Sequence, residues 1–255
     1  MRSERRLGGA LGALFALACA VATSAGRADE PKPQPPDPRL VARGLANYQR
    51  YCLACHGERG DGRGESASRM DPRPRDFTQG IYEWRSTPSG SLPVDGDLFR
   101  TIRRGLYGTQ MPRWSALTDP QIDELVAYVE HFSPRFDSEP RGVPIAIPPP
   151  PEGGAAAVER GRQVYEAMGC ASCHGPGGRG DGPSARWPGL VNDWGQPIQP
   201  TDLTTGHFER GSRPRDLYRL FMTGLDGTPM PSYFDSLAPD RAWDLAFYLE
   251  SLSNR

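Results

Sequence analysis

Lysine is nearly absent from this chain: of its 30 basic residues only Lys32 is a lysine, which leaves 29 arginines. The net charge is −1 at neutral pH, so no excess of positive charge indicates binding to nucleic acid. No stretch after residue 28 is apolar for long enough to cross a membrane. Alternating apolar patterns that would predict strands are also missing. With 30 glycines and 27 prolines, the chain is expected to form short helices joined by irregular segments.

Spare cysteines are missing as well. The chain has five cysteines, and four of them belong to two Cys-x-x-Cys-His motifs, so only Cys19 lies elsewhere. If the N-terminal segment is removed during export, no cysteine is left for a structural disulfide. The four remaining thiols of a protein in an oxidising compartment then need a partner or a cofactor.

Residues 1–28 have the layout of a secretory signal peptide, with arginines in Met1–Arg6, an uncharged apolar run over Leu7–Ser24 and small residues after it. This predicts export to the periplasm. One alternative is an uncleaved N-terminal anchor, and membrane contact is expected only in that case. A lipoprotein attached at Cys19 fits the preceding residues poorly. A Pro-rich linker is predicted over residues 29–37.

Two pentapeptides carry the chemistry of this chain, and they are Cys52-Leu-Ala-Cys55-His56 and Cys170-Ala-Ser-Cys173-His174. This pattern is the attachment site of c-type haem, in which both cysteines form thioethers with the ring and the histidine is the proximal iron ligand. We therefore expect two covalently bound haem c groups with iron. A redox dithiol would need a βαβ context, which is absent, and a zinc site would have to join two pairs 118 residues apart.

A methionine followed by proline occurs at nearly the same distance after each motif. Met111 lies 55 residues after His56, and Met230 lies 56 residues after His174. Each follows a Gly-x-x-Gly-Thr segment, which suits close approach of the backbone to a flat ring. A His/Met pair is the axial ligand set that raises the reduction potential of cytochromes c. We therefore predict both methionines as the second axial ligands, the alternative being ordinary core residues.

The two halves of the chain repeat one another. The matching segments, in chain order, are Gly44-x-x-x-Tyr48 with Gly161-x-x-x-Tyr165, Gly60-Asp61-Gly62 with Gly180-Asp181-Gly182, Asp76-Phe77-Thr78 with Asp202-Leu203-Thr204, and Asp97-Leu98-Phe99-Arg100 with Asp216-Leu217-Tyr218-Arg219. In this alignment Asp181 lies seven residues after His174, whereas Asp61 lies five residues after His56. Loop lengths differ elsewhere, yet the spacing from histidine to methionine changes by one residue only.

Helices are predicted from Leu40 to Tyr51, from Asp97 to Arg104 and from a start at Thr118-Asp119-Pro120, with a second copy of the last from Pro239 to Leu252. The domain limits expected from these patterns are 38–133 and 155–255. Residues 134–154 contain seven of the prolines and are predicted to be a semi-rigid, extended linker.

The motifs, the Met-Pro loops and the aromatic last helices together resemble the class I (mitochondrial-type) cytochrome c family, in a tandem dihaem form. The resemblance covers about residues 38–133 and 155–254. It implies an all-α fold of two tandem domains, each a few short helices wrapped around a covalently bound haem. It also implies that the first and last helices of each domain cross tightly at Gly44 and Gly161, against the helices of Tyr128 and Tyr248.

The function implied is transfer of single electrons between a protein redox donor and acceptor, by a free carrier or by a subunit of a respiratory or dehydrogenase complex. No catalytic residue and no small-molecule substrate are expected. A dihaem peroxidase or a haem-based gas sensor is the alternative, and either needs one labile axial methionine. His207 is predicted to be a structural or surface residue rather than an iron ligand, because its counterpart is Ile81. Arg73-Pro-Arg75 is predicted to be a solvated face.

Overall fold

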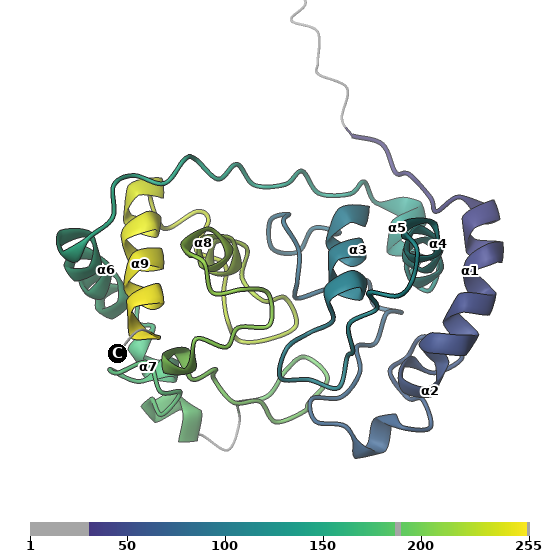
Figure 1. Ribbon diagram of the computed structural model, residues 1–255, viewed down its shortest axis with the longest axis horizontal. Helices are drawn as coiled ribbons and strands as arrows, with labels where there is room; N and C mark the ends of the chain where they lie inside the picture. The colour runs from purple at the N-terminus through teal and green to yellow at the C-terminus, as the bar shows by residue number, and fades with distance from the viewer. Residues whose placement is uncertain (1–30, 187–189, 254–255) are drawn as a thin grey trace, which may run out of the picture. The chain divides into compact units, whose positions relative to one another are not determined.

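The computed structural model describes residues 31–186 and 190–253 of the chain (Figure 1). The predicted signal peptide lies outside the described residues. Within them the regular structure is helical, and no strand forms beyond two isolated bridges, Leu92–Arg141 and Val191–Pro197. The prediction of an all-α fold is confirmed. No helix in this part of the chain has the length and apolar character that a membrane span requires.

Each half of the chain runs through a similar series of helices. The first half contains α1 (Pro38–Tyr51), α2 (Leu53–His56), η1 (Ala67–Arg69), α3 (Asp95–Arg104), α4 (Asp119–Glu130) and α5 (Arg135–Ser138). The second half contains α6 (Ala155–Ala167), α7 (Ala171–His174), η2 (Pro183–Arg186), η3 (Leu203–Thr205), α8 (Pro214–Thr223) and α9 (Pro239–Leu252).

The helix starts follow from local sequence signals. Asp37 caps α1 by accepting a hydrogen bond from the backbone N–H of Arg39 at 2.8 Å. Thr118 and Gln121 form a capping box at the start of α4, with a proline in the first turn. The predicted helices over these segments and over Pro239–Leu252 are confirmed.

The longest helices of each half cross at a glycine. In the first half α1 packs on α4, and in the second half α6 packs on α9, as Figure 1 shows. A Cβ atom at Gly44 would lie 2.2 Å from the carbonyl oxygen of Glu124, and one at Gly161 would lie 2.0 Å from that of Asp244. Only glycine permits helix backbones to come this close, so the crossings implied by the family resemblance are confirmed.

Each half has its own hydrophobic core. The fully buried side chains of the first core include Tyr48, Leu92, Ile122, Leu125 and Phe136, and those of the second include Tyr165, Leu217, Tyr218, Trp243 and Leu245. Ile122 and Leu125 of α4 are thus part of the first core. By their contacts, residues 31–255 nevertheless belong to one compact unit.

The segment that joins the two halves is less free than its prolines suggest. It begins with α5, and Phe136 of this helix is fully buried in the first core. Further along, the backbone N–H of Ile145 donates to the carbonyl of Ser86 at 2.8 Å, and Ile145 and Ile147 pack against the second core. The segment is therefore held on both cores over residues 135–147, where the sequence predicts an extended spacer. The domain limits drawn from the sequence stay a prediction.

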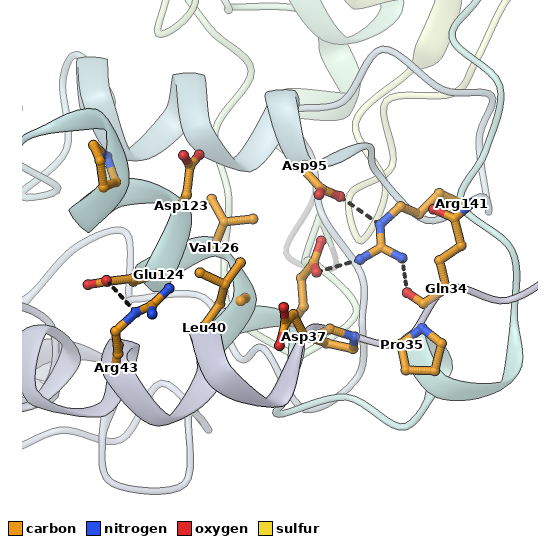
Figure 2. A pocket seen from close by; sticks show the side chains of 14 residues that line it. Gln34, Pro35, Asp37, Leu40, Arg43, Asp95, Asp123, Glu124, Val126 and Arg141 are labelled. Carbon is orange, nitrogen blue, oxygen red and sulfur yellow. Dashed lines mark hydrogen bonds and ion pairs between the residues drawn. The ribbon is translucent and has the colours of Figure 1, made fainter.

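Arg141 attaches the same segment to the first half (Figure 2). Its Nε donates to Asp95 Oδ1 at 2.7 Å, and its two other nitrogens reach the carbonyl of Gln34 and the carboxyl group of Glu130. These residues line a cavity of about 370 Å³ beside α1 and α4. Glu130 is 2% exposed, so its pairing with Arg141 takes place out of solvent.

Candidate functional site

Single helical turns present both Cys-x-x-Cys-His motifs. In α2 the backbone N–H of His56 donates to the carbonyl of Cys52 at 2.9 Å, and in α7 that of His174 donates to Cys170 at the same distance. A helical turn places the first cysteine, the second cysteine and the histidine on adjoining positions of one face. All four cysteines of the motifs are free of disulfide bonds.

Backbone carbonyls fix the orientation of the two histidine rings. His56 Nδ1 lies 3.2 Å from the carbonyl oxygen of Arg75, and His174 Nδ1 lies 3.0 Å from that of Thr201. A carbonyl can only accept, so Nδ1 carries the proton in each ring and Nε2 is left as a metal donor. Burial lowers the pKa of His56 to about 4 and also lowers the pKa of His174, which keeps both rings neutral.

These two carbonyls were missed by the sequence reasoning, although a signal was present. Arg75 and Thr201 directly precede Asp76 and Asp202, the first residues of a matched pair of segments. In both copies the Asp side chain accepts hydrogen bonds from the backbone N–H and the hydroxyl of the threonine two residues on. This Asx-type turn shapes the backbone next to the carbonyl that the histidine needs.

The chain turns back immediately after each histidine in the same way. The N–H of Gly62 donates to the carbonyl of His56 at 3.0 Å, and the N–H of Gly180 donates to that of His174 at 2.9 Å. Gly62 and Gly180 are therefore equivalent, each six residues after its histidine. The predicted match of Gly60-Asp61-Gly62 with Gly180-Asp181-Gly182 is wrong by two residues, because the hydrogen bonds pair Gly62 with Gly180, and both of these glycines have positive φ angles.

A tyrosine of the first helix supports each of these turns. Tyr48 donates from its hydroxyl to the carbonyl of Gly57, and Tyr165 donates to that of Gly175, both at 2.7 Å. Both rings are 1% exposed and belong to the cores. The Gly-x-x-x-Tyr match thus has two parts, a glycine for the helix crossing and a tyrosine that anchors the residue after the histidine.

Both methionines lie on loops of one design. The N–H of Leu106 donates to the carbonyl of Met111 at 3.2 Å, and the N–H of Leu225 donates to that of Met230 at 3.1 Å. The threonine two residues before each methionine accepts from the methionine N–H, at 3.0 Å in the first loop and 3.2 Å in the second. The repeated bonds close each loop into a small rigid ring.

The donor set in each half fits a covalently held haem. Cys52 and Met111 are both partly buried and pack against the first core, while Cys170 and Met230 pack against the second. Each half therefore offers two free thiols, a neutral imidazole with Nε2 available and a thioether sulfur, and one thiol and the thioether of each half lie against its apolar core. This combination suits a flat apolar ring whose iron takes one nitrogen and one sulfur ligand.

Two other sequence predictions have different outcomes. Arg75 is not on a solvated face: its side chain is 20% exposed, forms an ion pair with Glu83 and lies 4.1 Å over the ring of Trp194. That prediction is wrong for Arg75 because the second half of the chain covers it. His207 is exposed, and its ring contacts Tyr107 at 4.8 Å between centroids.

Comparisons with known proteins agree with this geometry. Residues 158–253 match the family described as cytochrome c, and residues 39–129 match cytochrome c oxidase, cbb3-type, subunit III. A solved chain of the reducing HAO-like protein complex Kustc0457/Kustc0458 of Kuenenia stuttgartiensis is 40% identical, with a TM-score of 0.80, over 88% of this chain and 99% of that one. The chain belongs to the cytochrome c family. It is a tandem dihaem c-type cytochrome with two covalently bound haems.

A curated relative of this cytochrome is the Cbb3-type cytochrome c oxidase subunit CcoP of Azospirillum brasilense. It is 24% identical over 220 residues, which cover 83% of this chain and 62% of the relative. The cytochrome therefore spans less than two thirds of that protein. Its two matched domains are cytochrome c domains, which carry haem for electron transfer.

Proposed function

We propose that this dihaem cytochrome works in the periplasm and passes single electrons through two His/Met-ligated haems. The thioether bonds and axial ligands are assigned to Cys52, Cys55, His56 and Met111 for the first haem and to Cys170, Cys173, His174 and Met230 for the second. The periplasmic location rests on the predicted signal peptide, whose residues lie outside the described part of the chain.

The observation that carries this proposal is the repetition of the whole donor arrangement. In both halves Nδ1 of the histidine donates to a backbone carbonyl, and a methionine follows on a loop closed by a leucine N–H. With a histidine and a methionine bound to it, each iron would have no open position for a substrate. A His/Met pair also raises the reduction potential, which suits a carrier.

Protein partners would meet the cytochrome at small, weak contacts, because a carrier has to dissociate after each transfer. The ring of Tyr107, on the Met111 loop, is 57% exposed and is accessible to such a partner. The 40% identity to a chain of an HAO-like complex supports work as a subunit of a redox complex.

The optical spectrum of the reduced holoprotein, with and without carbon monoxide, tests the proposal. Two His/Met haems have no open position, so we expect a c-type spectrum that carbon monoxide leaves unchanged. Met111→Ala and Met230→Ala should each make one haem bind the gas while both haems stay covalently attached. If the unmodified protein binds carbon monoxide at one haem, the peroxidase or gas-sensor function replaces the carrier function.

A further inference from the structure

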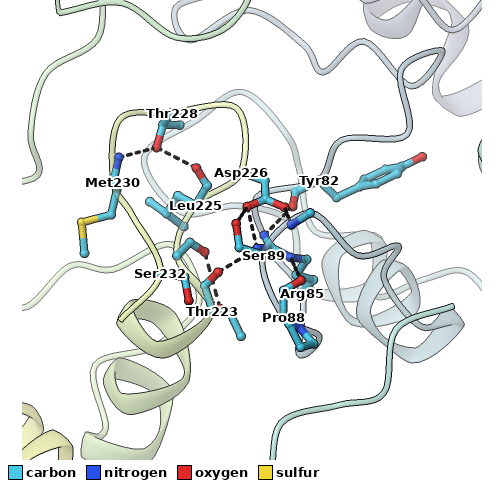
Figure 3. A network of polar contacts seen from close by, with 12 residues as sticks. Tyr82, Arg85, Pro88, Ser89, Thr223, Leu225, Asp226, Thr228, Met230 and Ser232 are labelled. Carbon is cyan, nitrogen blue, oxygen red and sulfur yellow. Dashed lines mark hydrogen bonds and ion pairs between the residues drawn. The ribbon is translucent and has the colours of Figure 1, made fainter. Parts of the chain in front are cut away.

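The two methionine loops share a design but differ at two positions, Gln110 against Pro229 and the residue after the loop leucine. The residue after the loop leucine is Tyr107 in the first domain and Asp226 in the second. The Tyr107 ring is 57% exposed. Asp226, in contrast, carries a carboxylate that the first domain encloses (Figure 3). The second methionine loop is therefore held by a neighbouring domain, whereas Tyr107 remains largely open to solvent.

Three groups of the first domain hold the Asp226 carboxylate. Its Oδ1 accepts from Arg85 Nη2 and from the Ser89 hydroxyl, both at 2.6 Å. Its Oδ2 accepts from the backbone N–H of Gly90 at 2.7 Å. Charge-assisted bonds of this kind are stronger than neutral ones, and both carboxylate oxygens take part.

Arg85 is itself fully enclosed, since the exposed fraction of its side chain is 0%. Within its own domain, Nε donates to the carbonyl of Pro88 at 3.2 Å, and Nη1 donates to that of Tyr82 at 3.1 Å. Nη2 donates across to the carbonyl of Thr223 at 2.7 Å, in addition to Asp226. A buried guanidinium with all three nitrogens engaged has little freedom to move, and removing its partner would leave an uncompensated charge.

The clamp, by which we mean Arg85, Ser89 and Gly90 around the Asp226 carboxylate, is linked to Met230 through the chain itself. Asp226 is flanked by Leu225, whose N–H closes the loop onto the carbonyl of Met230. Thr223, the last residue of α8, leads into the same loop. Arg85 thus holds the methionine loop at two residues, at Thr223 where the loop begins and at Asp226 within it. The position of the Met230 side chain therefore depends on the first domain.

We propose that Arg85 is a positioning residue for the second haem: through Asp226 and Thr223 it holds the Met230 loop where the sulfur binds iron. The proposal rests on the proposed function, in which Met230 is an axial ligand. Its consequence is an asymmetry between the two haems. Ligation at the second haem depends on the buried Arg85–Asp226 contact between the domains, whereas the first methionine loop meets the second domain at the exposed contact of Tyr107 with His207.

The test uses Arg85→Met and Asp226→Asn in the full-length holoprotein, with imidazole as a probe of the ferric irons. In both variants we expect one haem to bind imidazole at least about tenfold more tightly than in the unmodified protein. A redox titration should show the same haem at a lower potential. That haem is identified as the second one if Met230→Ala moves the same potential.

Two control variants separate positioning from general damage. Arg160→Gln removes an Arg–Asp ion pair of the second domain, at Asp244, away from the methionine loop. Tyr107→Asn changes the equivalent position of the other loop. Neither should alter imidazole binding or either potential. A change of similar size in Arg160→Gln would mean that any lost ion pair loosens the second haem, and it would overturn the proposal.

The outcomes also separate this proposal from the proposed function. If Met230→Ala leaves both potentials and imidazole binding unchanged, the axial assignment itself fails. If Met230→Ala changes them while folded Arg85→Met and Asp226→Asn do not, the axial assignment stands and the clamp serves domain docking alone. Asp226→Asn keeps the shape of the side chain, so it decides the matter if Arg85→Met does not fold.

Discussion

Gly161 of α6 lies directly against the backbone of Asp244 in α9, with 2.0 Å between the carbonyl oxygen of Asp244 and the place of a Cβ atom. No side chain fits in that space without moving one helix away from the other. Because these two helices form the main packing pair of the second domain, any shift also disturbs the core that carries Tyr165 and Trp243.

Gly161→Ala should therefore lower the free energy of unfolding by about 1–3 kcal/mol, the usual cost of overpacking. Chemical denaturation followed by circular dichroism measures the change. Gly96→Ala in α3 is the matched control, since the nearest atom to its Cβ would be 3.7 Å away. That substitution should leave stability unchanged or raise it by up to about 1 kcal/mol. Equal effects from both would contradict the tight crossing.

The assignment of the haem-binding cysteines gives a second prediction. Cys170→Ala combined with Cys173→Ala should leave one covalent haem instead of two, because the first domain has its own motif and its own core. Intact-protein mass spectrometry should show the loss of one haem mass. Ser172→Ala, between the two cysteines and exposed, should keep both haems. Loss of both haems in the double variant would show that the domains do not mature separately.

Phe136 tests how firmly the joining segment is attached to the first domain. Its ring is fully buried, so Phe136→Ala should leave a cavity and cost about 3–5 kcal/mol of stability. Val143→Ala in the same segment is the control, because this side chain is 70% exposed and should change stability by no more than about 0.5 kcal/mol. Thermal unfolding of both variants would be compared. Similar melting temperatures would mean that the segment is a free spacer after all.

Glu130 gives a prediction about pH. Burial, with a further contribution from the nearby Asp95, raises the pKa of Glu130 to about 8, although Arg141 acts in the opposite direction. Between its ordinary value of 4.5 and about 8, the unfolded chain loses this proton while the folded chain retains it. The unfolded state then binds fewer protons, so the contribution of Glu130 to stability falls as the pH rises across this window.

Glu130→Gln should remove that contribution. The melting temperature of the variant, relative to the unmodified protein, should rise steadily from pH 5 to pH 8. Glu152→Gln, in the exposed part of the joining segment, is the control and should give a difference that does not vary with pH. A constant difference for Glu130→Gln as well would show that the Glu130 carboxyl ionises alike in the folded and unfolded chain.

Much of the site could be predicted from the sequence because its parts are local. A Cys-x-x-Cys-His motif needs one helical turn, and a capped helix such as α4 needs signals within four residues. The glycines at positions 44 and 161 were expected as well, since each stands four residues before a tyrosine and the family resemblance implies a tight helix crossing there. These features depend on neighbours along the chain, and their patterns are visible without a fold.

The register of the glycine turn was predicted incorrectly for a physical reason. Gly60-Asp61-Gly62 was aligned with Gly180-Asp181-Gly182 because the residues are identical. The feature that the two halves share in the fold is a backbone turn, and the aspartate does not occupy the same place in it. The hydrogen bonds from Gly62 to His56 and from Gly180 to His174 define equivalent positions. The glycine-rich segments after the two histidines can be aligned by sequence in two registers. Only one of these registers pairs the two glycines whose N–H groups donate to the histidine carbonyl.

The sequence by itself determined that two haems are carried and where their motifs lie, because short-range patterns encode both. Tertiary structure alone decided that Arg85 is enclosed with Asp226, 141 residues away, and that the joining segment packs on both cores. The residues next to Arg85 in the sequence do not indicate that its side chain is buried. Its place depends on which carbonyls and carboxylates the folded second domain brings to it.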